Sequence, residues 1–261
     1  MKKPLKSKSL AASKAGKSSA SAARKSGKPV ALKSSKSVKG TAPAKADKAA
    51  KPAKAAKAPA SAEKLDLLKV HKAAYVTPSK PVLLTPKAAQ YLVVEGQGAP
   101  GGPVFEARLG ALYSMAFTIK MSRKFAGKGD YAVSKLEAVY PGIGDGPGTP
   151  REQWCWKLMI LSPDFLASSD LEAAVALLTK RGKQGDAALV RLERIQEGPC
   201  VQMLHVGPYD RECETLAVME AFAKSKGLGL SGFFHEIYFS DPRRVEADKL
   251  RTLIRHPVSP L

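Results

Sequence analysis

The chain has 261 residues, with 43 Lys and Arg against 23 Asp and Glu and a formal net charge of +20. Residues 1–60 carry 17 of the basic residues and one acid, Asp47, whereas every aromatic residue follows residue 60. A segment without aromatic side chains cannot bury enough apolar surface to offset the entropy of ordering its backbone. The first 60 residues are therefore excluded from any core, and the remainder is long enough for a globular domain.

The composition also excludes membrane and secreted classes of protein. No apolar run approaches the ~18 residues of a membrane-spanning helix. The basic start of the chain lacks the apolar segment of a secretory signal, so we expect a cytoplasmic protein. The 3 cysteines show no C-x-x-C spacing and are predicted to be free thiols.

Residues 1–62 are predicted to form a disordered basic tail, because they consist almost wholly of Lys, Ala, Ser, Pro and Gly. Lysines spaced along a flexible backbone neutralise phosphates without reading bases. The composition resembles the tails of linker histones, which implies nonspecific binding to nucleic acid and association with the nucleoid. The alternative is a solubilising extension that has no partner.

Residues 63–261 are predicted to form one α+β domain that contains a duplicated β-α-β-β unit. The first unit spans roughly residues 88–163 and the second roughly residues 198–258, and each reads as strand, helix, strand, strand. The helices are indicated by apolar residues that recur every three or four positions, and the strands by apolar alternation. Neither unit is large enough to be stable alone, so the two are expected to share one sheet and one core.

Glu236 is the main candidate for a ligand-binding residue. On a strand, its face is shared with Phe234 and Tyr238, two positions away on either side. Burying a carboxylate among aromatic rings is costly, and a cationic ligand would offset that cost by charge pairing and by cation–π attraction. The alternative is a strand glutamate that pairs with Lys or Arg on a solvated face. The residues alone leave these two interpretations open.

Glu137 is predicted to hold the equivalent place in the first unit, because residues 136–140 align with residues 235–239. Its strand face is shared with Val139 and is less aromatic than that of Glu236. Trp156, on the following strand, and Tyr113, on the helix of the first unit, are candidates for the walls of a cavity. For Trp156 the alternative is packing in the core.

The sequence predicts neither a cofactor nor a metal site. Residues 96–101 match G-x-G-x-x-G, a pattern typical of dinucleotide binding. However, Pro100 and Pro103 remove backbone donors that a phosphate would need, and a hairpin follows where a second βαβ unit is required. The 4 histidines show no ligand spacing, so we expect no metal centre.

Several segments resemble the GyrI-like small-molecule-binding family. They occur in the family's order across about residues 64–261 and are 156–165, 204–209, 234–244 and 250–258. The resemblance implies two β-α-β-β repeats of the SHS2 type around a pseudo-twofold axis, with a ligand cleft between them. It places Glu236 in that cleft, with Tyr238 beside it and Trp156 and Tyr113 as walls. Phe234, on the strand face of Glu236, and Tyr140 complete the six expected ligand-binding residues. The standalone branch of the family usually has Trp where this chain has Tyr140, so we expect a cleft of different shape.

The resemblance and the tail together imply three functions. The first is the binding of amphipathic or cationic aromatic small molecules, with the tail as a tether to nucleic acid. The second, implied by the standalone branch, is hydrolysis of cyclopropane-bearing DNA-alkylating compounds, with Glu236, Tyr238 and Glu137 as the catalytic residues. The third is histone-like nonspecific DNA binding in which the domain is incidental. The sequence decides neither whether the protein is an enzyme nor its oligomeric state.

Overall fold

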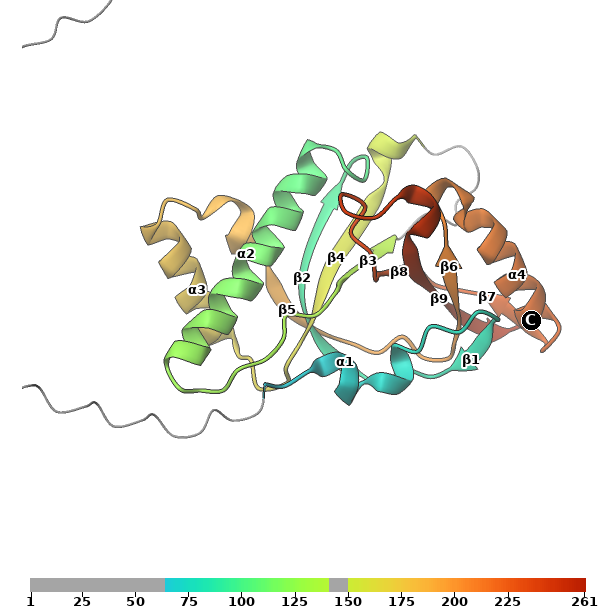
Figure 1. The fold of residues 1–261 in the computed structure, drawn as a ribbon, viewed down its shortest axis with the longest axis horizontal. Coiled ribbons are helices and arrows are strands. Elements are labelled where there is room, and N and C mark those ends of the chain that lie inside the picture. Colours follow the sequence, from blue (N-terminus) through green and yellow to red (C-terminus); the bar gives the residue numbers. More distant parts are fainter. Residues whose placement is uncertain (1–63, 141–149) are drawn as a thin grey trace, which may run out of the picture. The chain divides into compact units, whose positions relative to one another are not determined.

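A computed structural model describes residues 64–140 and 150–261 (Figure 1). The predicted tail, residues 1–62, lies outside these ranges, and its disorder stays a prediction. Within them the fold is α+β, as predicted. The strands are β1 (Val82–Leu84), β2 (Ala89–Gln97), β3 (Leu136–Tyr140), β4 (Cys155–Ser162), β5 (Arg191–Ile195), β6 (Cys200–Val206), β7 (Leu228–Leu230), β8 (Phe234–Tyr238) and β9 (Arg251–Pro260).

The strands form one antiparallel sheet that contains both predicted units. Its order is β1-β6-β9-β8-β3-β4-β2-β5, and β7 pairs with β9. The first unit is β2-α2-β3-β4 and the second is β6-α4-β8-β9. Each unit contributes three adjacent strands, and the two halves meet where β3 pairs with β8. The duplication and the shared sheet are therefore confirmed.

The register of the central pair corrects the predicted alignment of the two units by one residue. Ala138 pairs with Glu236, and Tyr140 pairs with Phe234. Because the helices of both units pack on the same face, equivalent residues must point to the same side of the sheet. Side chains alternate along a strand, so a shift of one residue moves every side chain to the other face. The residue equivalent to Glu236 therefore lies on the helix face of β3, as Ala138 and Tyr140 do, and the predicted match with Glu137 is wrong.

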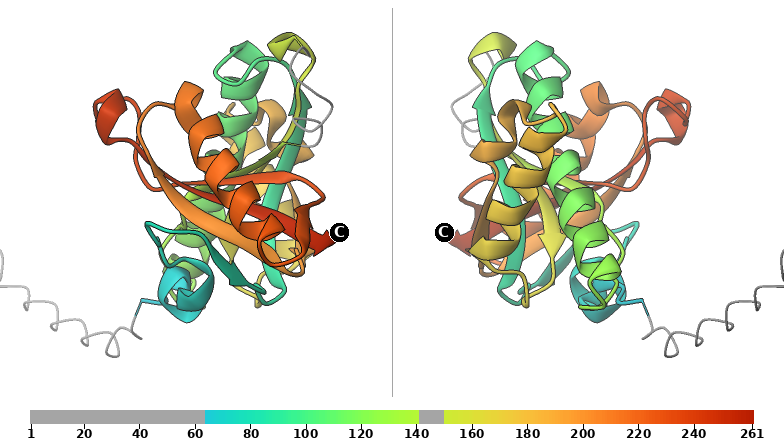
Figure 2. Two further views of the ribbon diagram at one scale, coloured as in Figure 1. Left: turned by 90° about the vertical axis from the view of Figure 1, so that its right-hand side faces the viewer. Right: turned by 90° about the vertical axis from the view of Figure 1, so that its left-hand side faces the viewer.

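Four α-helices accompany the sheet in the described ranges: α1 (Leu67–Val70), α2 (Pro103–Phe125), α3 (Ser168–Lys180) and α4 (Glu212–Lys224). None of them is long and apolar enough to span a membrane. Pro103 occupies the first turn of α2, where its missing N–H costs nothing. Figure 2 views the helices from the α4 side and from the side of α2 and α3.

The sheet has a different covering on each face. The larger apolar cluster joins buried residues of α2 and α4, such as Met115 and Met219, to sheet residues including Ala138 and Leu158. The smaller cluster, on the second face, joins Leu67 of α1 to residues such as Tyr91, Met159 and Ile237. We call these the helix face and the second face. Strand alternation consequently sends neighbouring residues of β3 and β8 into two separate environments.

Candidate functional site

Glu236 lies at the middle of β8 and faces the helices. Its neighbours Phe234 and Tyr238 belong to or pack against the helix-face cluster, and Glu236 itself is 7% exposed. The Tyr238 hydroxyl donates a hydrogen bond to Oε2 of Glu236. The structure thus brings together the three strand residues whose alternation indicated a binding site.

Tyrosines from both units surround this carboxyl. Tyr140, at the end of β3, and Tyr238, at the end of β8, occupy equivalent positions, and their hydroxyl oxygens are 2.9 Å apart. The ring of Tyr209 meets that of Tyr238 edge to face, with centroids 6.0 Å apart. Phe234 packs beside Tyr140 at 6.4 Å between centroids. Glu236 therefore has an aromatic environment on the helix face.

A second carboxyl, which the sequence analysis did not single out, completes the site. Glu212 is the first residue of α4, is 6% exposed, and forms a side-chain hydrogen bond with Glu236. The Thr252 hydroxyl contributes a further hydrogen bond to Glu212. A glutamate in the first turn of a helix is commonplace, because it complements the helix dipole. The sequence therefore carried no signal that separates Glu212 from an ordinary surface residue.

The pKa values of both carboxyls are raised. Burial, followed by the adjacent charge of Glu236, raises the pKa of Glu212 to about 10. Burial also raises the pKa of Glu236, although hydrogen bonds from Tyr238 and Glu212 oppose that rise. Two carboxylates in contact cannot both remain ionised without a compensating cation. The pair is therefore expected to hold one proton at neutral pH, and the opposing hydrogen bonds favour the ionised form of Glu236.

Glu212 has one oxygen whose hydrogen-bonding capacity is unused. Its Oε1 atom is buried and has no hydrogen-bond partner among the described residues. Buried polar atoms without partners are uncommon in native proteins and call for a physical explanation. A bound molecule that accepts a hydrogen bond from this carboxyl would supply one.

Two other predicted residues, Tyr113 and Trp156, lie on the helix face in different roles. Tyr113 of α2 is half-buried and stacks on Phe117 with ring centroids 6.2 Å apart. Trp156 is 1% exposed, and its ring packs edge-on against Phe105 at the start of α2. Trp156 therefore packs in the core, as in the alternative interpretation, and it is also among the residues that line a cavity.

The glycine-rich segment at the end of β2 contributes to the same packing. The indole Nε1 of Trp156 donates a hydrogen bond to the carbonyl of Gly98 at 2.9 Å. A Cβ at residue 96 would lie 2.7 Å from Cζ2 of Trp156, so this position requires glycine. Core packing thus explains the glycine at residue 96 of the G-x-G-x-x-G match. No group of three or more His, Cys, Asp or Glu side chains in the described ranges is placed to hold a metal ion.

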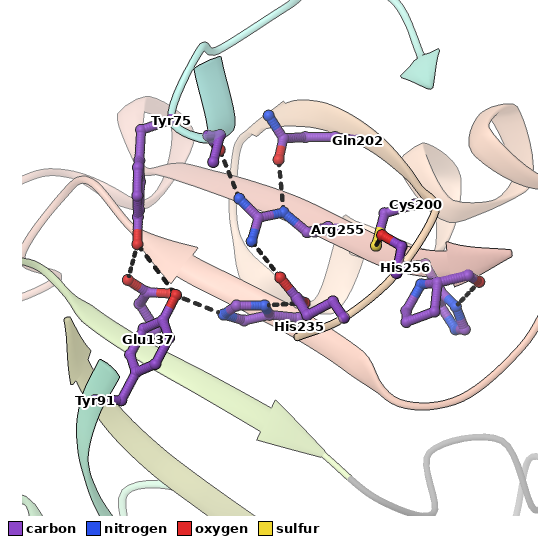
Figure 3. Close-up of polar contacts among 12 residues, drawn as sticks. Tyr75, Tyr91, Glu137, Cys200, Gln202, His235, Arg255 and His256 are labelled. Carbon is purple, nitrogen blue, oxygen red and sulfur yellow. Dashed lines mark hydrogen bonds and ion pairs between the residues drawn. The ribbon is translucent and has the colours of Figure 1, made fainter. Parts of the chain in front are cut away.

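Glu137, the third predicted catalytic residue, is not brought together with Glu236. It pairs with Ile237 in the sheet and points to the second face, where its exposed fraction is 0%. There it accepts hydrogen bonds from Tyr75 at 2.6 Å and from Nε2 of His235 at 3.0 Å (Figure 3). The sheet itself separates it from the Glu212–Glu236 pair, so Glu137 takes no part in that site.

Comparison with known proteins places the chain in a family. A hydrolase from Listeria innocua is 35% identical, with a TM-score of 0.70 over 76% of this chain and 100% of that chain. An uncharacterized conserved protein from the same organism is also 35% identical, with a TM-score of 0.71 over 75% of this chain and 100% of that chain. The chain belongs to the family of these Listeria proteins, and its fold fits the GyrI-like fold that the sequence resemblance implied.

Other comparisons add little. The structure of SAV2435 bound to tetraphenylphosphonium is 14% identical, with a TM-score of 0.33 over 69% of this chain and 94% of that chain. That is too little similarity to indicate a shared ligand. No family model matches the chain, and no curated protein matches it.

Proposed function

We propose that this protein hydrolyses small electrophilic molecules, with Glu212 as the general acid and Glu236 as the general base. The observation that carries the proposal is the pair of buried, hydrogen-bonded carboxyls, Glu212 and Glu236, whose pKa values are both raised. Such a pair supplies both partners of acid–base catalysis at neutral pH. A relative of 35% identity, described as a hydrolase, supports the proposal.

The chemistry needs one water and restores the pair at each turnover. Glu236 accepts a proton from the water, and the water oxygen forms a bond to the electrophilic carbon of the substrate. The bond from that carbon to the leaving atom breaks, and the leaving atom keeps the electron pair and takes the proton of Glu212. The sum is one water added across one bond. The proton gained by Glu236 then passes to Glu212 through the hydrogen bond between them.

The surroundings of the pair favour an aromatic substrate. The pair lies among the rings of Tyr140, Tyr209, Phe234 and Tyr238, and of these Tyr209 is 38% exposed and can contact an aromatic substrate. The buried carboxyls favour a carbon that develops positive charge as its bond breaks. Compounds that combine an aromatic body with a strained three-membered ring meet both requirements, and the family resemblance points to the same class.

The test measures turnover of an aromatic, cyclopropane-bearing alkylating compound. Turnover is monitored by the change in absorbance as the three-membered ring opens. Glu236→Gln and Glu212→Gln keep the shape of each side chain but remove the proton exchange, and we expect rates about 10²-fold to 10⁴-fold below the wild type. Glu214→Gln is the matched control, because Glu214 lies on the same helix but is exposed and paired with Arg211. Equal rates in all four proteins would refute the assignment.

Binding without turnover is the second candidate, favoured by the aromatic rings around an ionised carboxylate. A cationic aromatic dye would gain charge pairing and cation–π attraction there. A ligand stabilises the folded state by mass action, so the dye should raise the melting temperature of the wild type but not of Glu236→Gln. That shift, combined with no turnover of any electrophile, would establish a binding protein in place of a hydrolase.

A further inference from the structure

A large cavity lies on the second face of the sheet, away from the carboxyl pair. Its volume is about 850 Å³. The sheet forms one wall through residues such as Val139, Met159 and His235, and residues 71–91 and 193–197 contribute the others. Pockets of roughly 300–1,000 Å³ suit drug-sized molecules.

The polar floor of this cavity is a closed network with no free charge. Arg255, 1% exposed, donates hydrogen bonds to Glu197, to Gln202 and to the carbonyl of Ala74 (Figure 3). His235 bridges Glu197 and Glu137 through its two ring nitrogens. Each charged group in the network thus has a partner of opposite sign.

The charges of this floor sum to zero. Burial lowers the pKa of His235, but Glu197 and Glu137 outweigh burial and raise it to about 9. Burial raises the pKa of Glu197, but His235 and Arg255 bring it down to about 2. Two positive groups, His235 and Arg255, therefore balance two carboxylates, Glu137 and Glu197. An ionic ligand would be desolvated here without gaining a counter-charge.

At the rim, Lys87 is exposed and its charge lies in solvent, whereas Lys157 is paired. Lys157 lies 2.6 Å from Glu193 and 3.3 Å from Glu95, so its charge is neutralised at the edge of the cavity. Tyr75 and Tyr91 line the cavity at the Glu137 end of the floor network, where their hydroxyl oxygens are 3.4 Å apart, and Phe233, 55% exposed, lines it from the solvent side. These surfaces favour flat apolar molecules.

We propose that this cavity is a second binding site, which takes neutral aromatic molecules of drug size. It differs in selectivity from the helix-face site, whose carboxyl pair favours positive charge. His235 and Glu236 are consecutive residues of β8, so one strand contributes to both sites from opposite faces. The inference does not rest on the hydrolase proposal, because the two sites share no side chain.

The test uses Nile red, a neutral aromatic dye whose fluorescence rises in apolar surroundings, with the full chain. We expect saturable binding of one dye per chain. Ala74→Trp places a large ring in the cavity and should raise the dissociation constant for the dye at least about tenfold. Ala73→Trp is the matched control. Ala73 precedes Ala74 in the sequence, but its side chain is exposed and does not line the cavity. It should leave the dissociation constant unchanged.

Two further variants keep the test decisive. If circular dichroism shows that Ala74→Trp is unfolded, Phe233→Ala, which shortens an exposed side chain at the mouth, should weaken binding instead. Glu236→Gln should not alter the affinity for the dye. Absence of saturable binding, unchanged affinity in the cavity variants, or loss of binding in Glu236→Gln would each overturn the proposal.

Discussion

Glu212 and Glu236 bring two carboxyls into contact, although each would prefer water if ionised. Burial and mutual repulsion disfavour the charged forms, and one shared proton relieves both. Burying the pair therefore lowers the free energy of unfolding by an amount that depends on pH. Active sites commonly carry such costs, because a proton donor and an acceptor at neutral pH require shifted pKa values.

The raised pKa of Glu212 predicts how the stability of the Glu212→Gln variant differs from that of the wild type. The folded pKa of Glu212, about 10, lies above the ordinary value of 4.5, so the unfolded state releases the proton first. The penalty is absent below pH 4.5 and grows as pH rises toward 10. Removing the titratable group should stabilise the protein by about 1–3 kcal/mol at pH 8 and by nothing at pH 4.

The measurement is urea unfolding of the wild type and the variant at several pH values. Glu214→Gln serves again as the control, because Glu214 is exposed and bonded to Arg211. A gain for Glu212→Gln that is equal at every pH would contradict a raised pKa of Glu212.

A pair of buried tyrosines gives a second prediction at the scale of single residues. Tyr75 donates a 2.6 Å hydrogen bond to the buried carboxylate of Glu137, whereas the Tyr131 hydroxyl is buried with no partner among the described residues. Tyr75→Phe should lower the free energy of unfolding by about 1.5–3 kcal/mol, and Tyr131→Phe should be neutral or stabilising. Denaturant unfolding of both variants would show this order, and the reverse order would refute it.

Among the elements, β3 and β8 show what the sequence can and cannot predict. Their apolar alternation predicted both strands and the shared face of Phe234, Glu236 and Tyr238. The register between them depends on how two distant strands meet, and a slip of one residue exchanges the faces. That is why Glu137 was matched with Glu236. The three-residue strands β1 and β7 were not predicted, because so short a segment has no measurable period.

The junction between β2 and α2 predicts the effect of adding a single methyl group. A Cβ at residue 96 would meet the indole of Trp156, and that ring is fixed by Phe105 and by its bond to Gly98. Gly96→Ala should therefore destabilise the fold by about 1–3 kcal/mol through overpacking. Gly110→Ala, at an open position of α2, should instead stabilise it by about 0.5–1 kcal/mol. Thermal unfolding that moves both variants in the same direction would contradict this account.

At the scale of the whole molecule, the duplicated units were predictable and the second face was not. The apolar periodicity of the helices and strands in each unit, and the order of these elements, can be read from a single sequence. The polar network of the second face joins Tyr75 to Glu137 and Arg255 to Ala74, which are 62 and 181 residues apart. No local pattern connects residues at such separations. Glu212 was missed for the same reason, since only the packing of α4 on the sheet brings it to Glu236.

The basic tail allows a test of how the chain as a whole meets nucleic acid. Residues 1–60 carry 17 Lys and Arg and one acid, against 26 basic and 22 acidic residues in 61–261. We propose that the full chain binds DNA of any sequence through this segment. If about six phosphates are contacted, affinity should fall roughly 10³-fold between 50 and 200 mM salt.

Removing residues 1–60 should abolish this binding, because the remaining chain has an excess of only four basic residues. Fluorescence anisotropy of a labelled duplex would measure it over a salt series, with a second duplex of unrelated sequence as the control. Equal affinity for both duplexes is expected, since the tail has no aromatic side chain to stack on bases and no element that reads their edges. If the shortened chain bound as tightly as the full chain, the charge of the tail would have another purpose, and the domain itself would carry the DNA surface.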